Sequence, residues 1–130
     1  MTGHHQWKSG SLWARLQQRR RAALGSGALR PIDTGQVRIR DRGVDFLVRV
    51  VAHLADKPHA ADDVRSAAAN PDPFLPYDRD LFVADIGDTH LCLLNKFNVI
   101  DHHLLVVTRA FEHQESPLTL ADFSAWWRCM

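Results

Sequence analysis

The fold is decided by residues 91–109, which read LCLLNKFNVIDHHLLVVTR. This stretch contains two short apolar segments joined by a polar, basic corner. Because side chains alternate along a strand, Leu91 and Leu93 face one way while Cys92 and Leu94 face the other, and both faces are apolar. The second segment alternates in the same way. We therefore predict a β-hairpin that is covered on both faces and lies centrally in a sheet.

Asn95 and Lys96 end the first strand of this hairpin with polar side chains. A side-chain amide both donates and accepts hydrogen bonds, which suits the edge of a base or a ribose, and an ammonium group suits a phosphate. The simpler interpretation is an ordinary strand end, where an asparagine turns the chain and a lysine reaches water. The chemistry of the two side chains leaves both interpretations open.

The composition is that of one ordinary globular domain. The chain has 130 residues, of which 45% are hydrophobic and 24% charged, and its net charge is +1. This balance favours neither a nucleic acid nor a membrane surface as partner. No apolar run reaches the roughly 20 residues of a membrane span, and no secretion signal is recognisable at the start. We expect a cytoplasmic protein with two reduced thiols, Cys92 and Cys129, and no metal site.

The first element is a helix at residues 11–24, where apolar side chains recur at helical spacing and Gly25 is the expected stop. Arg20 falls inside the apolar stripe of this helix. Either its stem lies along apolar surface with the guanidinium in water, or the guanidinium meets a partly buried anion. That anion is an acidic side chain elsewhere in the chain or a ligand phosphate.

The remaining elements complete an α+β fold with a mostly antiparallel sheet flanked by helices. Alternating apolar residues predict a short strand at 36–39 and strands at 44–54, 81–85, 89–96 and 103–108. A proline-rich connector separates the strand at 44–54 from those that follow. We treat residues 1–130 as a single domain.

A final helix is predicted at 119–130, with Thr119 and Asp122 in a capping-box pattern. The helix carries Trp126 and Trp127, and the sequence stops without a glycine, a proline or a polar last turn. Nothing else in the sequence is placed to cover this apolar surface. We therefore expect a fold that is incomplete at the C-terminus, or a helix that pairs with another chain.

Several blocks of the sequence resemble the N-terminal half of the diadenosine tetraphosphate phosphorylases, also called ATP adenylyltransferases. The resemblance runs from about Leu12 to the end and is densest after Leu81. The blocks that carry it are LLNKFNVI at 93–100, HHLLVVT at 102–108, FEHQES at 111–116, FLVRVV at 46–51, Lys57-Pro58 and NPDPFLPY at 70–77.

The resemblance implies a histidine-triad-like fold and an enzyme that splits diadenosine tetraphosphate with inorganic phosphate into ATP and ADP. It implies that Lys57, Asn95 and Lys96 contact the nucleotide, because they match a lysine and an Asn-Lys pair of the family. The ligand is then an adenine nucleotide or a dinucleoside polyphosphate, and inorganic phosphate is the co-substrate. Residue chemistry agrees, since cations neutralise a polyphosphate and an amide orients a nucleoside.

The nucleophile of that family, a histidine in a His-x-His-x-Gln motif, has no match here, since no two of the eight histidines are separated by one residue. We predict no catalytic residue in this chain and expect it to be inactive alone. His102 and His103 are interpreted as turn histidines. Two functions remain open. One is the nucleotide-binding half of a nucleotidyltransferase; the other is a non-catalytic, truncated or partner-pairing domain that uses the Trp126/Trp127 helix.

Overall fold

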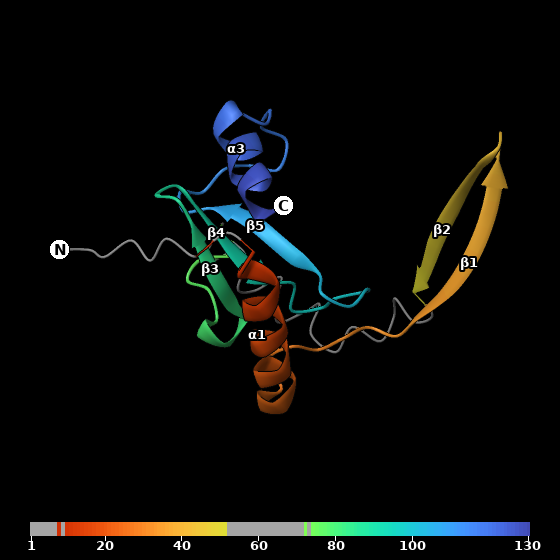
Figure 1. Ribbon diagram of the computed structural model, residues 1–130, viewed down its shortest axis with the longest axis horizontal. Helices are drawn as coiled ribbons and strands as arrows, with labels where there is room; N and C mark the ends of the chain where they lie inside the picture. Colours follow the sequence, from red (N-terminus) through yellow and green to blue (C-terminus); the bar gives the residue numbers. More distant parts are fainter. Residues whose placement is uncertain (1–7, 9, 52–71, 73) are drawn as a thin grey trace.

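The computed structural model describes residues 8, 10–51, 72 and 74–130, which have the predicted α+β fold (Figure 1). Their strands form two antiparallel sheets, β1–β2 and β3–β4–β5, where one sheet was expected. None of the described helices is long and apolar enough to cross a membrane. The elements follow the order α1 (Leu12–Ser26), β1 (Thr34–Asp41), β2 (Val44–Val51), η2 (Arg79–Leu81), β3 (Phe82–Ile86), β4 (His90–Leu94), β5 (Leu104–Thr108) and α3 (Leu120–Cys129).

Strand β4 is the centre of the three-stranded sheet, between β3 and β5. All five of its residues are buried, and Leu91 and Cys92 are 0% exposed. Both faces are therefore covered, which explains the unbroken apolar run of this strand. Strand β5 is half-buried throughout and forms one edge of the described sheet, so only the first strand of the predicted hairpin is central.

Helices α1 and α3 lie beside the three-stranded sheet (Figure 1). They pack on the face of β4 that carries Cys92 and Leu94, because these two residues share one buried cluster with residues of both helices. Helix α1 continues past the predicted stop at Gly25, because Gly27 and not Gly25 adopts the left-handed conformation (φ 78°) that ends a helix. The buried cluster at this interface consists of Leu12, Leu16, Ala23, Leu29, Leu81, Val83, Ala84, Ile86, Cys92, Leu94 and Ala125.

The β1–β2 hairpin, called the arm from here on, stands away from the sheet and the helices (Figure 1). Its two-residue turn is Arg42-Gly43, with φ values of 47° and 83°. A two-residue hairpin turn needs such left-handed conformations so that its twist matches that of the strands. Strand β1 is eight residues long, against the four predicted, because it pairs with β2 along its whole length.

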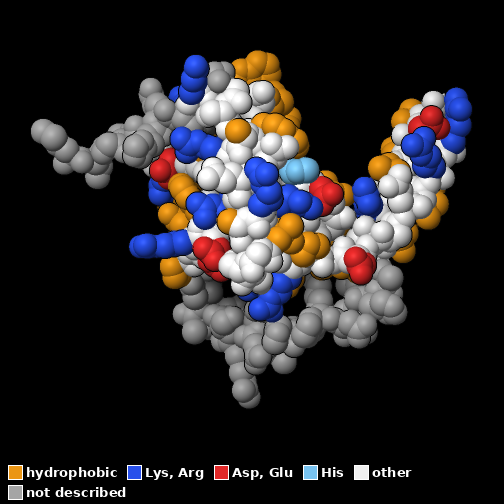
Figure 2. Space-filling model, turned by 60° about the horizontal axis from the view of Figure 1, so that its bottom comes forward, with side chains coloured by type: hydrophobic (Ala, Val, Ile, Leu, Met, Phe, Trp, Pro, Cys, Tyr) orange, Lys and Arg blue, Asp and Glu red, His pale blue; other side chains and the backbone are white. Residues whose placement is uncertain are grey.

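One face of the arm is apolar and largely open to solvent. The register pairs Ile39 with Phe46 and Val37 with Val48, which puts these cross-strand neighbours on the same face. Val37, Ile39 and Phe46 remain 47%, 48% and 49% exposed. In Figure 2 the arm carries hydrophobic side chains along its length and basic ones near its tip. Residues 52–54 of the predicted strand lie outside the described residues.

The capping box at the start of α3 is confirmed. Thr119 Oγ1 accepts a hydrogen bond from Asp122 N, and an Asp122 carboxylate oxygen accepts one from Thr119 N. Ala125 is the one fully buried residue of this helix. Trp126 and Trp127 are 57% and 72% exposed, so the apolar surface expected on α3 is present.

Candidate functional site

Asn95 and Lys96 lie directly after β4, in the turn that begins the 95–103 loop, and not in the strand as predicted. The chain turns there because Asn95 N donates to His103 O at 2.9 Å, closing the loop. Asn95 Oδ1 accepts a hydrogen bond from Phe97 N at 3.2 Å, and its Nδ2 lies 3.4 Å from His103 Nδ1. The amide of Asn95 therefore shapes the turn. This is the role that an asparagine has at an ordinary strand end.

Lys96 presents its ammonium group to solvent. The side chain is exposed and its Nζ lies 5.6 Å from the ring centroid of Phe97, a distance at which a cation is attracted to the ring face. The backbone is fixed, because Lys96 O accepts a hydrogen bond from Arg30 N at 2.8 Å. No carboxylate among the described residues forms an ion pair with Lys96. Its charge is available to an anion.

Helix α1 and the segment after it hold the 95–103 loop in place. Arg20 donates to Asp101 Oδ1 at 2.7 Å. The partner of this arginine is therefore a side chain of the same protein, but that carboxylate is 69% exposed and not partly buried as expected. The rings of Trp13 and His102 lie 4.6 Å apart. These contacts come from residues that are distant in the sequence, and they hold the loop in one conformation. Two further bonds, Ile32 N to Asn98 O and Thr34 Oγ1 to Val99 O, complete this support.

Of the three residues predicted to contact a nucleotide, the structure describes two. Asn95 and Lys96 are neighbours at one end of the central strand. Lys57 lies outside the described residues, and so does most of the connector that was predicted between the strands. His102 and His103 are half-buried in the loop and contact Trp13 and Asn95, as expected for turn histidines.

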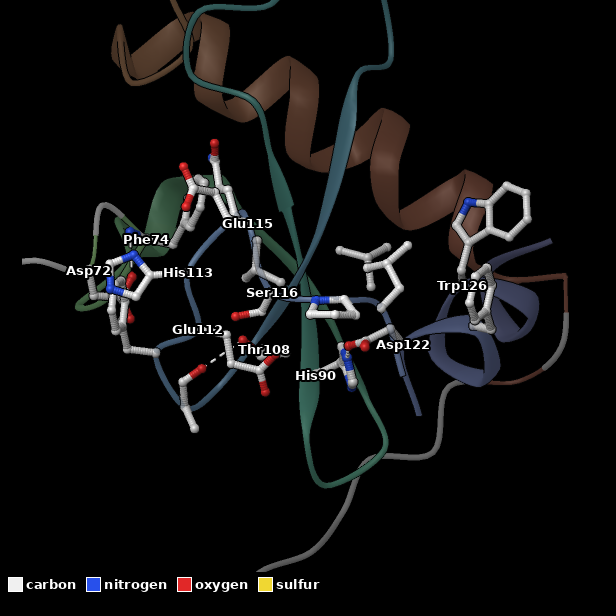
Figure 3. A pocket seen from close by; sticks show the side chains of 18 residues that line it. Asp72, Phe74, His90, Thr108, Glu112, His113, Glu115, Ser116, Asp122 and Trp126 are labelled. Atoms are coloured by element: carbon white, nitrogen blue, oxygen red, sulfur yellow. Dashed lines mark hydrogen bonds and ion pairs between the residues drawn. The ribbon is translucent and has the colours of Figure 1, made fainter. Parts of the chain in front are cut away.

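A hollow of about 1050 Å³, which the sequence analysis did not predict, lies at the other end of β4 and β5 (Figure 3). It mixes aromatic side chains with carboxylates, and no lysine or arginine is among the described residues that line it. The described lining therefore offers a polyphosphate no lysine or arginine. Its lining consists of Asp72, Phe74, His90, residues 106–108, residues 110–118, Asp122, Phe123 and Trp126.

Within the hollow, His90 connects β4 to the first turn of α3. Figure 3 shows His90 beside Asp122, and its Nε2 lies 2.8 Å from Asp122 Oδ1. Its Nδ1 lies 2.9 Å from Thr89 Oγ1. Hydrogen bonds from the hydroxyl and the backbone N–H of Thr119, and then from His90, lower the pKa of Asp122 to about 2. The carboxylate is thus used to position α3. The described residues contain no group of histidines, cysteines and carboxylates able to hold a metal ion.

The family model described as Ap4A phosphorylase N-terminal domain matches residues 2–130 of the chain. The chain belongs to this family. Diadenosine 5',5'''-P1,P4-tetraphosphate phosphorylase 2 of Saccharomyces cerevisiae is 35% identical to it over 106 residues, which are 78% of this chain and 32% of that protein. The expected resemblance to the N-terminal half of these phosphorylases is confirmed.

Solved structures of the family share the fold. Yeast Ap4A phosphorylase Apa2 in complex with AMP superposes with a TM-score of 0.71 at 26% identity, covering 93% of this chain and 39% of that one. The complex of Apa2 with Ap4A has a TM-score of 0.67 at 30% identity, covering 86% and 35%. The chain therefore spans little more than a third of the length of these relatives.

Proposed function

We propose that this chain binds an adenine nucleotide or a dinucleoside polyphosphate, as the nucleotide-contacting part of an enzyme that splits diadenosine tetraphosphate with inorganic phosphate. Membership of the Ap4A phosphorylase N-terminal domain family supports this proposal. So does the likeness to a yeast phosphorylase that was solved with AMP and with Ap4A. The histidine-triad-like architecture and a cytoplasmic location belong to the same proposal.

The observation that carries the proposal is the ammonium group of Lys96. It is exposed, no described carboxylate pairs with it, and its backbone is hydrogen-bonded at a fixed place at the end of β4. A cation held in this way compensates phosphate charge without losing an existing ion pair. In the proposed site Lys96 and Lys57 contact phosphates.

Asn95 has a different role in the proposed site. Its Oδ1 is engaged by Phe97 N, while its Nδ2 faces His103 at 3.4 Å, a long contact that a ligand acceptor can replace. The amide N–H₂ is therefore the group of Asn95 that we assign to the nucleoside. Because the sequence contains no His-x-His pair, we assign no catalytic residue in this chain and propose that it does not turn over diadenosine tetraphosphate alone.

Isothermal titration calorimetry with diadenosine tetraphosphate and with AMP tests the proposal. Lys96→Ala should weaken binding of the tetraphosphate about tenfold, since one charge-assisted contact is worth roughly 1.4 kcal/mol. Arg38→Ala is the matched control, because it removes one exposed cation from β1 of the arm. The control should bind as the wild type does. Equal losses for both variants, or no heat from the wild type, would contradict the proposal.

A second candidate, a partner-pairing domain without nucleotide function, is favoured by α3. In this helix Leu120, Trp126 and Trp127 are 81%, 57% and 72% exposed. A surface helix of a monomeric protein usually exposes far less apolar surface. The calorimetry separates the candidates, because a pairing domain with no nucleotide site gives no heat with either ligand.

A further inference from the structure

Cys92 and Cys129 lie side by side where the last turn of α3 meets β4. Their sulfur atoms are 3.7 Å apart, although the residues are 37 positions apart in the sequence. Both are free thiols. A disulfide bond is about 2.05 Å long, so bond formation requires the two sulfurs to approach by roughly 1.7 Å. Rotation of the Cys129 side chain at the end of its helix is enough to supply a movement of this size.

The two thiols differ in environment, which gives each a distinct chemistry. Cys92 is 0% exposed, whereas Cys129 is only partly buried. A hydrogen bond from the Cys92 thiol lowers the pKa of Cys129. The same contact, together with burial, raises the pKa of Cys92. The thiolate is the nucleophilic form of cysteine, so the lesser burial and the lowered pKa of Cys129 both favour this thiol as the one that reacts first.

We propose that Cys129 and Cys92 form an oxidative modification site, in which a peroxide oxidises Cys129 and Cys92 closes a disulfide that joins α3 to β4. In the first step Cys129 Sγ attacks one oxygen of hydrogen peroxide. The O–O bond breaks, an S–O bond forms, and the departing hydroxide takes the thiol proton as water. In the second step Cys92 Sγ attacks the sulfenic sulfur; the S–O bond breaks, the S–S bond forms, and the hydroxide leaves with the Cys92 proton as water. Two thiols lose two electrons and the peroxide gains them.

The disulfide would join α3 to the sheet, and α3 otherwise makes few buried contacts with it. Helix α3 fully buries only Ala125, and its first turn is held by the contact of His90 with Asp122. His90 and Cys92 lie on the same face of β4, two residues apart, so they contact the two ends of the helix. Oxidation adds a covalent bond at the end opposite the His90 contact. This site is independent of the nucleotide proposed above.

Mass spectrometry of the full chain after treatment with hydrogen peroxide tests the proposal. We expect a loss of about 2 Da from the unreduced monomer, a crosslinked peptide pair that contains Cys92 and Cys129, and reversal by dithiothreitol. Peptide mapping separates this product from oxidation of the two methionines. The midpoint of thermal unfolding should rise by roughly 10 °C on oxidation, because the crosslink restricts the unfolded chain.

Two variants assign the roles. Cys129→Ser should show neither the mass loss nor the thermal shift. Cys92→Ala should accumulate a sulfenic acid at Cys129 that dimedone traps, because the second thiol is missing. The proposal is overturned if peroxide leaves both thiols of the wild type free, if Cys129 is over-oxidised to sulfinic acid while Cys92 stays reduced, or if the disulfides that form link two molecules.

Discussion

The β4–β5 hairpin and the arm have similar sequence patterns but differ in burial. Each contains strands with apolar side chains on at least one face and antiparallel pairing along the full register. Strand β4 is completely buried, whereas Ile39 and Phe46 of the arm are about half exposed (48% and 49%). Apolar alternation thus specifies a strand and its pairing. Burial requires other elements to pack on the strand, and α1 and α3 do so only at the three-stranded sheet.

The tips of the two hairpins differ as well. The arm turns in two residues, Arg42-Gly43, and its tip lies in solvent. The β4–β5 hairpin turns through the 95–103 loop, which α1 holds by the Arg20–Asp101 ion pair. A long loop that a rigid scaffold supports is where binding residues commonly lie, because its side chains are free while its backbone is ordered. This difference supports the proposal of a nucleotide site at the β4–β5 hairpin and not on the arm.

The largest difference in stability is expected when one large apolar residue of each hairpin is replaced by alanine. Leu91→Ala should lower the free energy of unfolding by about 3 kcal/mol, since Leu91 is 0% exposed and its removal leaves a cavity. Ile39→Ala on the arm should lower the free energy of unfolding by less than about 1 kcal/mol, because that side chain is 48% exposed. Urea denaturation followed by circular dichroism measures both. Comparable losses in the two variants would mean that the arm is covered in solution.

A smaller effect is expected from the contact between β4 and α3. Because the pKa of Asp122 is about 2 in the folded protein, below its ordinary value of 3.8, this group stabilises the fold above pH 4 and the contribution is lost as pH falls from 4 through 2. Asp122→Asn should therefore lower the midpoint of thermal unfolding at pH 5. At pH 2 the midpoints of the variant and the wild type should differ less.

Asp41→Asn, at an exposed position of the arm, is the control for this pH series. Its midpoint should follow that of the wild type across the same range. If Asp122→Asn and the wild type lose stability in parallel between pH 5 and pH 2, the carboxylate does not hold α3.

The smallest effect is expected at the tip of the arm. Gly43 has φ 83° and open space around its α-carbon, so Gly43→Ala introduces backbone strain without a steric clash. The cost is about 1 kcal/mol and is confined to the arm. Hydrogen exchange of the β1 and β2 amides should quicken while exchange in β4 stays unchanged. Faster exchange in β4 would show that the arm and the sheet unfold together.

Local patterns predicted much of the scaffold. The helix at the start, the central strand, and the capping box of Thr119 and Asp122 all depend on residues close together in sequence. Contacts across long separations were not predictable in this way. Arg20 had two possible anions, and only packing of α1 on the loop selected Asp101, which is 81 residues away. His90 was not recognised as a partner of Asp122, 32 residues away, and the hollow beside them was missed as a result.

The sequence by itself determined which segments are strands and helices and which family the chain resembles, because side-chain periodicity, capping and motif spacing are local properties of the chain. Tertiary structure alone decided that the arm is exposed, that no described carboxylate pairs with Lys96, and that Cys92 meets Cys129. The physical reason is that burial and pairing depend on which distant surfaces pack together, and the free energy of that packing is shared over the whole molecule.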